Sequence, residues 1–379
     1  MNTDALYNVA RAAKTICAGA TVMMLMSLSA IAAAQPFLPR VQSSFVFSTI
    51  PANGDVNPYG VAFVPSGFPG GHLNPGDILV TNFNNSANKQ GFGTSILRVQ
   101  LNPQPGFQQT STFATTGGVT GLTAALGVIK QGFVFVGSVP TTDGTSNTVS
   151  NGPLLVLDNA GNVVDTINSP PLHGPWGLAI NSTNAAHVQV FVSNVNVVGN
   201  QPPGKTGTVS RLDFSFPTPG TIHMDSITQI GSDYSNTADP AAVVIGPAGL
   251  AYDGKRDILY VAGEDDDTIF AIPDASTTTD HGTGKVVYSS LRHLHGPMGL
   301  ALGPNGDLIV ANNDSINANP KRPSEIVEIT ASGAFVRQFS IDPNIDGPFG
   351  IAIGEFNELK ELAFVNDNNN TLSVWNFAE

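Results

Sequence analysis

The sequence reads Gly-Pro-Met-Gly-Leu-Ala from Gly296 to Ala301 and Gly-Asp-Leu-Ile-Val-Ala-Asn from Gly306 to Asn312. From Pro297 onward this stretch has the order proline, any residue, glycine, aliphatic residue, alanine, apolar residue. This six-residue pattern, called the repeat phrase below, recurs along the chain. Full copies begin at Pro58, Pro175, Pro247, Pro297 and Pro348, and the last three are about 50 residues apart. A worn copy without the proline, at 120–124, divides the long gap after Pro58. The chain therefore contains six repeats.

Each repeat continues with short strands separated by turns. After Pro297, a turn at Asn305-Gly306 precedes strands that we expect at 308–311, 325–329 and 335–339. Asn-Gly turns between alternating apolar runs indicate β-hairpins. Four short strands per repeat of about 50 residues are typical of propeller blades. The sequence thus predicts an all-β fold, a six-bladed β-propeller; the alternative, a solenoid, should show capping repeats and a shorter period.

The two ends of the chain indicate how the ring closes. The last repeat supplies only three expected strands, at 350–353, 361–365 and 371–377. A spare apolar strand at 44–48 resembles the fourth strand of the preceding repeat, at 334–340. We expect this N-terminal strand to complete the last blade, because an unpaired sheet edge invites aggregation.

With these motifs the chain resembles the NHL-repeat propellers, and in particular secreted bacterial NHL-like proteins that are uncharacterised. The resemblance spans residues 44–377. It implies that connections between blades, and those between second and third strands, share one face of the ring. Long insertions at such connections, including 84–93, 232–246 and 313–323, predict a binding face there, because binding residues concentrate on loops of a rigid scaffold.

The N-terminus has the pattern of a secretory signal peptide. Lys14 precedes an apolar run that ends in Ala32-Ala33-Ala34, so we expect residues 1–34 to be removed and residues 35–379 to form a single propeller domain, secreted or periplasmic. An uncleaved membrane anchor is the alternative. The only cysteine, Cys17, lies in this segment, so the mature chain would have no internal disulfide.

Charge and composition exclude some partners. The chain has a net charge of −13 and no basic cluster along its sequence, which argues against a nucleic-acid partner. We expect a monomer without membrane contact after signal cleavage, which binds an unidentified protein or small molecule. The low charged fraction of 12%, with 40 glycines and 27 prolines, supports an all-β chain rich in turns.

The residue between proline and glycine in each phrase should face the central channel. In the five full copies these residues are Tyr59, Trp176, Ala248, Met298 and Phe349. They predict an apolar, partly aromatic mouth, which could bind a sugar face, an acyl chain or a peptide, or could simply be packing. His173 and His295 stand at matched positions before Gly-Pro in two repeats, and we expect them at the same rim.

Metal ligands are the other candidates. His173 and His295, with Asp239 or Asp346, would suit zinc with an open coordination position. Asp265, Asp266 and Asp267 form the densest acidic group and would suit calcium, although aspartates also cap tight turns. The sequence contains no nucleophile elbow, His-Glu-x-x-His motif or phosphate loop, so we expect no organic cofactor, and whether the chain is an enzyme stays open.

Three functions remain. The first is a binding scaffold that holds a ligand or a protein across the long-loop face. The alternative is a metal-dependent lactonase or lyase, as the resemblance to six-bladed gluconolactonase-like propellers implies. The third is a structural component of an envelope assembly. The fold by itself does not separate them.

Overall fold

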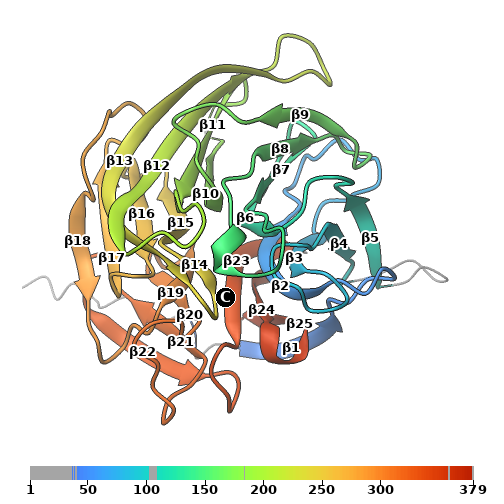
Figure 1. Cartoon of the computed structure of the whole chain (residues 1–379). Helices are drawn as coiled ribbons and strands as arrows, with labels where there is room; N and C mark the ends of the chain where they lie inside the picture. The colour runs from blue at the N-terminus through green and yellow to red at the C-terminus, as the bar shows by residue number, and fades with distance from the viewer. Residues whose placement is uncertain are drawn as a thin grey trace, which may run out of the picture. The chain divides into compact units, whose positions relative to one another are not determined.

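The computed structural model describes residues 36, 38, 41–101, 109–182, 184–356 and 359–377. The expected signal peptide at 1–34 lies outside these residues. In the described part, no helix is long and apolar enough to cross a membrane. The strands form six separate sheets, arranged as the blades of a β-propeller (Figure 1). The predicted fold class is confirmed.

The first strand of every blade faces the centre of the ring. These strands contact one another in a closed circle, and the circle returns from blade 6 to blade 1. In blade order they are β2 (Val56–Phe63), β6 (Leu122–Ile129), β10 (Pro175–Asn181), β15 (Pro247–Asp253), β19 (Pro297–Leu302) and β23 (Pro348–Phe356). Each begins within two residues of a repeat phrase, the worn copy included, so the repeats and the blades coincide.

The second and third strands of each blade follow in antiparallel order. The second strands are β3 (Ile78–Asn84), β7 (Phe133–Ser138), β11 (His187–Asn194), β16 (Ile258–Gly263), β20 (Leu308–Asn312) and β24 (Leu359–Asn366). The third strands are β4 (Ser95–Val99), β8 (Leu154–Leu157), β12 (Gly204–Ser215), β17 (Thr268–Pro273), β21 (Glu325–Ile329) and β25 (Thr371–Phe377). Most second and third strands are almost wholly buried, as expected where blades pack on both faces.

The fourth strands form the outer rim. Blades 1 to 5 supply their own, namely β5 (Thr110–Thr115), β9 (Val163–Ile167), β13 (His223–Asp239), β18 (Lys285–Ser289) and β22 (Phe335–Ser340). Blade 6 takes β1 (Val41–Ser48), which pairs antiparallel with β25, with Phe45 opposite Val374 and Phe47 opposite Leu372. The expected completion of the last blade by the N-terminal strand is confirmed.

Blade 3 departs from the four-strand expectation. The segment 232–246, expected as a loop, is mostly strand: β13 runs to Asp239 and pairs with a fifth strand, β14 (Val243–Ile245). The Asn236 side chain holds β13 there, because its Nδ2 donates to the Val195 carbonyl at 2.7 Å. Two 3-10 turns, η2 (Ser146–Thr148) and η3 (Asp367–Asn369), complete the described elements.

The glycine of the repeat phrase lets neighbouring blades approach closely. A Cβ at this position would lie within 2.5 Å of a backbone carbonyl oxygen of the next blade in four repeats: Gly177 with Ala248, Gly249 with Met298, Gly299 with Phe349, and Gly350 with Tyr59. The last pair joins blade 6 to blade 1. Only glycine permits this spacing, so the repeated glycine is a requirement of ring closure.

Candidate functional site

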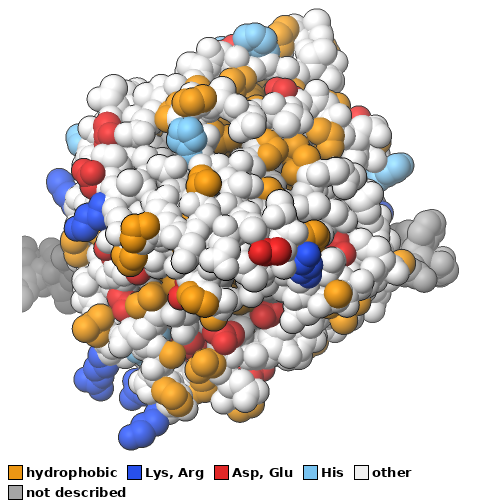
Figure 2. Space-filling model, viewed as in Figure 1, with side chains coloured by type: hydrophobic (Ala, Val, Ile, Leu, Met, Phe, Trp, Pro, Cys, Tyr) orange, Lys and Arg blue, Asp and Glu red, His pale blue; other side chains and the backbone are white. Residues whose placement is uncertain are grey.

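A cavity of about 290 Å³ lies at the mouth of the central channel. Residues from blades 1, 3, 4, 5 and 6 line it, and three of the long loops expected at the binding face contribute, at 84–90, 239–244 and 313–315. The mouth lies on the side turned to the viewer in Figure 1, where β14 reaches toward the centre of the ring. In Figure 2, acidic side chains gather just below the centre of this face.

The residue that follows the second strand makes the same backbone contact in five blades. Its N–H donates to the carbonyl of the glycine directly before the first strand at 2.8–3.1 Å: Val139 to Gly121, Val195 to Gly174, Glu264 to Gly246, Asn313 to Gly296 and Asp367 to Gly347. In blades 2 and 3 the residue is a valine of the central core. In blades 4 to 6 it is polar and lines the cavity. The mouth is therefore apolar on one side and acidic on the other.

Glu264 is the most deeply buried acid of the cavity, with 1% of its surface exposed. Its Oε1 accepts hydrogen bonds from Asn313 Nδ2 at 2.6 Å and from Ser315 Oγ at 2.9 Å. Its Oε2 has no hydrogen-bond partner among the described residues. Burial raises the pKa of Glu264 to about 8, because the low-dielectric surroundings disfavour the carboxylate.

Asp314, in blade 5, also has one hydrogen-bonded and one unpaired carboxyl oxygen. Its Oδ2 accepts a hydrogen bond from the Ser324 backbone N–H at 2.7 Å, and its Oδ1 is buried without a partner in the part of the chain that the structure describes. Burial raises the pKa of Asp314 to about 6. Burial also raises the pKa of Asp367 to about 7, and the nearby charge of Asp346 adds to that rise. With Asp239, five carboxyl groups line the cavity.

Neutral polar groups also face the cavity unpaired. The side-chain oxygens of Asn57 and Asn84, and the indole Nε1 of Trp176, are buried and have no partner among the described residues. Leaving a buried polar atom unpaired costs free energy, so native proteins rarely do so without a bound group to complete it. Four of the five unpaired atoms, including those of Glu264 and Asp314, are oxygens.

The type of donor atom in this cavity suits a hard divalent cation. Carboxylate and amide oxygens are the ligands that calcium and magnesium prefer. Within the described residues, no lysine or arginine lines the cavity to neutralise its acids. Glu264 and Asp314 would supply carboxylate oxygens, and Asn57 and Asn84 amide oxygens.

Aromatic rings form the apolar side of the cavity. The Tyr59 ring lies 4.7 Å from that of Phe349 and 5.5 Å from that of Trp176, between ring centroids. All three line the cavity and are at least 93% buried. The structure thus brings three predicted channel residues together, in contact with one another. Met298 lies in the same core cluster but does not line the cavity, and its Sδ contacts Asn313 Nδ2.

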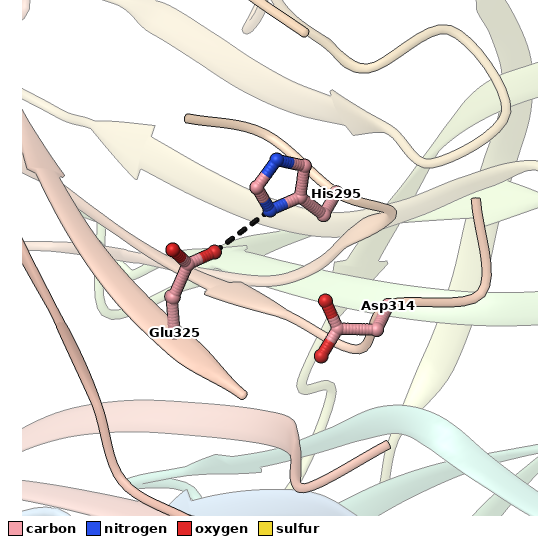
Figure 3. Close-up of side chains that lie close together, drawn as sticks. All are labelled: His295, Asp314 and Glu325. Atoms are coloured by element: carbon pink, nitrogen blue, oxygen red, sulfur yellow. Dashed lines mark hydrogen bonds and ion pairs between the residues drawn. The ribbon is translucent and has the colours of Figure 1, made fainter. Parts of the chain in front are cut away.

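His295 lies in a second cluster, with Asp314 and Glu325 (Figure 3). Each of the three residues offers a ligand atom, and these atoms lie within 4.8 Å of one another. However, His295 Nδ1 is hydrogen-bonded to Glu325 Oε2 at 2.8 Å, and this contact raises the pKa of His295, so the two form a buried ion pair. In Figure 3 the second ring nitrogen of His295 points away from both acids.

The position of Glu325 indicates a structural role for this ion pair. Asn312 Nδ2 donates to Glu325 Oε2 at 3.3 Å. The corresponding asparagines of blades 1 and 3 donate to serine hydroxyls, Asn82 to Ser95 at 3.4 Å and Asn194 to Ser210 at 3.1 Å. The same bond between second and third strands therefore recurs with a different acceptor.

The predicted zinc set does not assemble. His173 and His295 precede the first strands of blades 3 and 5, and neither lines the cavity. Asp239, at the end of β13, and Asp346, on the loop before β23, do line it. The matched positions of the two histidines reflect the repeat, which places equivalent residues around the ring and not together.

The predicted calcium group, Asp265 to Asp267, is used in loop contacts. Asp266 accepts hydrogen bonds from the backbone N–H and hydroxyl of Ser235, and Asp267 accepts one from the Gly296 N–H at 2.8 Å. Burial raises the pKa of Asp265, and none of the three lines the cavity. The oxygens of Asp266 and Asp267 thus join segments that are distant in the sequence, rather than bonding the backbone of their own turn.

Sequence reasoning missed Glu264, Asp314 and Asp367 as cavity acids. Each follows a second strand, in a segment that the sequence indicates only as one of several polar turns. For Glu264 and Asp367 the signal was a shared distance from the repeat phrase, which their backbone hydrogen bonds to Gly246 and Gly347 reveal. Asp314 lies one residue further along its repeat, where its N–H donates to the His295 carbonyl.

Comparisons with known proteins support the fold. No family model matches the chain, and no curated protein does. Among solved structures, a gluconolactonase from Xanthomonas campestris is similar at a TM-score of 0.53 and 10% identity, over 90% of this chain and 93% of that one. A calcium-binding protein, regucalcin, from Agrobacterium tumefaciens is similar at 0.51 and 12%, over 88% and 95%. At these identities the likeness shows the propeller fold alone, and the NHL resemblance stays a prediction.

Proposed function

We propose that this protein binds a divalent cation at the channel mouth and hydrolyses a cyclic ester there. The observation that supports the proposal is the set of buried, unpaired oxygens of Glu264 and Asp314 in a cavity lined by five carboxyl groups. The similar structures are a gluconolactonase and a calcium-binding protein, which agrees with this chemistry. The alternative expected from the sequence, a metal-dependent lactonase, is therefore better supported than a binding scaffold.

A divalent cation bound in the cavity would act as a Lewis acid on a carbonyl oxygen. Glu264 and Asp314 would hold it, and both must be deprotonated to do so. Asp367, with a pKa of about 7, can take up a proton near neutral pH and is the best general base among the cavity acids. Tyr59, Trp176 and Phe349 would contact the apolar part of a substrate.

Export remains part of the proposal. The N-terminal segment supports a secreted or periplasmic location. The only cysteine, Cys17, lies in that segment, so the mature protein would fold there without a disulfide. A test is whether the protein recovered from the cell envelope or medium begins after Ala34. A protein that retains its first residues would contradict the cleavage.

The experiment combines cation binding with hydrolysis. Chelator-treated protein is titrated with Ca²⁺, Mg²⁺ and Zn²⁺ by calorimetry, and lactone opening is followed by acid release. We expect Glu264→Gln to weaken cation binding and hydrolysis at least about tenfold, because a charged ligand is lost. The matched control is Glu361→Gln, since Glu361 is also buried with an unpaired Oε2, has a pKa raised to about 7 by burial, and lies outside the cavity.

The outcomes separate the two halves of the proposal. Absence of cation binding, or equal effects of the two substitutions, would overturn the metal site. Cation binding that depends on Glu264, without hydrolysis of any aliphatic or sugar lactone, would overturn the hydrolase and leave a cation-dependent binding protein.

A further inference from the structure

We infer that blade 5 carries an oxyanion-binding site, separate from the channel mouth, that takes a phosphate group. The site is a cavity of about 450 Å³ lined by Arg292, Arg322 and Arg337, together with His293 and Phe335. The three arginines come from the connection between β18 and β19, the loop between β20 and β21, and β22. None of the residues that line this cavity lines the acidic one.

The three arginines of this cavity have no ion-pair partner among the described residues. Three other arginines form ion pairs with aspartates: Arg98 with Asp77 at 2.6 Å, Arg211 with Asp213 at 3.5 Å, and Arg256 with Asp253 at 3.5 Å. Arg292 and Arg322 are exposed, and with Arg337 they place three guanidinium groups around one cavity of a chain whose net charge is −13, which favours an anion there.

Among the described residues, one carboxylate lines this cavity, that of Glu325, and its oxygens already accept hydrogen bonds from the protein. Glu325 is fully buried and accepts hydrogen bonds from His295, Asn312 and Gln338. The hydrogen bond to Glu325 raises the pKa of His295. None of the three arginines is a hydrogen-bond or ion-pair partner of Glu325 in the described part of the chain.

Aromatic rings give the cavity a rigid wall. The His293 ring is stacked on that of Phe335, with 4.0 Å between centroids, and its Nδ1 is hydrogen-bonded to the Tyr288 hydroxyl. Burial, with the charges of Arg292 and Arg322, lowers the pKa of His293, and the charge of Glu325 acts in the opposite direction. Arg292 and His293 are adjacent in the chain, and both line the cavity together with Arg322.

The chemistry of the lining favours phosphate. A guanidinium group donates two parallel hydrogen bonds to phosphate or carboxylate oxygens, and three such groups suit an anion with more than one charge and several oxygens. The cavity volume lies in the range of small-ligand sites. Leu291 is 72% exposed beside Arg292, and Phe335 is 40% exposed, so an apolar contact next to the anion is available. In Figure 2, Lys and Arg side chains gather at the lower left, over the position of β21 and β22 in Figure 1.

The phosphate group could belong to a soluble ester or to a lipid headgroup, and two arms of one experiment distinguish these sources. Binding of inorganic phosphate and of glycerol phosphate is measured by calorimetry at low salt. Binding to vesicles of phosphatidylcholine, with and without phosphatidic acid, is measured by co-sedimentation. We expect phosphate binding in the first arm. Retention on anionic vesicles alone would assign the site to a lipid headgroup.

Two double variants test whether the arginine-lined cavity is the binding site. The double substitution Arg292→Gln and Arg322→Gln should weaken binding at least about tenfold, because two charge-assisted contacts are lost. The matched control is Lys205→Gln with Lys255→Gln, which removes the same charge from two exposed positions outside the cavity. If both double variants lose the same affinity, the loss reflects only the change in net charge, and the proposed site is overturned. Failure of the wild-type protein to bind phosphate and anionic vesicles would overturn it as well.

Discussion

At the scale of single residues, the function of this protein depends on where acids are left unpaired. Asp266 and Asp267 accept backbone hydrogen bonds from neighbouring segments and so hold loops together. Glu264 and Asp314, a few residues away in their own repeats, each retain one unpaired oxygen at the cavity. The sequence marks all four as acids after a strand. Only the surroundings of each carboxyl group distinguish one that joins two segments from one that could bind a ligand.

These acids predict a pH dependence of stability. Glu264 has a pKa of about 8 in the folded protein against an ordinary value of 4.5. Between these values the folded state binds more protons than the unfolded chain, so the unfolding free energy of the metal-free protein falls as pH rises. Calcium should restore stability at pH values of about 8 and have little effect near pH 5, because it binds the carboxylate form.

Thermal unfolding, recorded from about pH 5 to pH 8 with calcium or with chelator, checks this expectation. Glu264→Gln should flatten the fall in Tm with pH, since the group can no longer ionise. A metal-free protein that becomes more stable with rising pH over this range would contradict the assignment of the raised pKa.

At the scale of elements, the ends of the chain meet in one blade. The pairing of β1 with β25 was predictable because the last repeat lacks a strand and the N-terminus supplies one with the right alternation. The strand content of 232–246 was not predictable, because its pairing depends on Asn236 reaching the carbonyl of Val195, far away in the sequence. Local pattern thus predicts strands that repeat, and it fails where a side chain specific to one blade stabilises the strand.

Phe47 provides a test of β1 as part of the core. Its side chain is 7% exposed and packs in the central cluster, whereas Phe45, two residues earlier in the same strand, is 46% exposed. We expect Phe47→Ala to lower the unfolding free energy by about 3–5 kcal/mol and Phe45→Ala by about 0.5 kcal/mol. Urea unfolding measures both, and similar losses would mean that β1 does not close blade 6 as described.

At the scale of the whole molecule, ring closure depends on the close approach of first strands. Gly350 and Tyr59 make the closing contact between blades 6 and 1, because a Cβ on Gly350 would lie 1.9 Å from the Tyr59 carbonyl oxygen. The same ring brings the cavity acids together from four blades and places Arg292, Arg322 and Arg337 around another cavity. The absence of a basic cluster along the sequence was therefore no guide to the charge distribution on the surface.

Gly350→Ala should open the ring at this joint. We expect a large fall in Tm, with loss of cation binding at the mouth, because Tyr59 and Phe349 line the cavity beside the joint. Gly118→Ala is the control, since no atom lies within 4 Å of a Cβ there. Differential scanning calorimetry and calcium titration measure the two effects, and a Gly350→Ala protein as stable as the control would contradict a closed ring.

The sequence by itself determined the number of blades, the closure of the last blade by the N-terminal strand and the aromatic residues at the channel. These features follow from local pattern, since strands alternate with a period of two and the phrase repeats with the blades. Only the tertiary structure decided which acids stay unpaired, that neither His173 nor His295 lines the mouth cavity, and that three arginines share a cavity. The physical reason is that ligand sites depend on distances between blades and on burial, which no single repeat encodes.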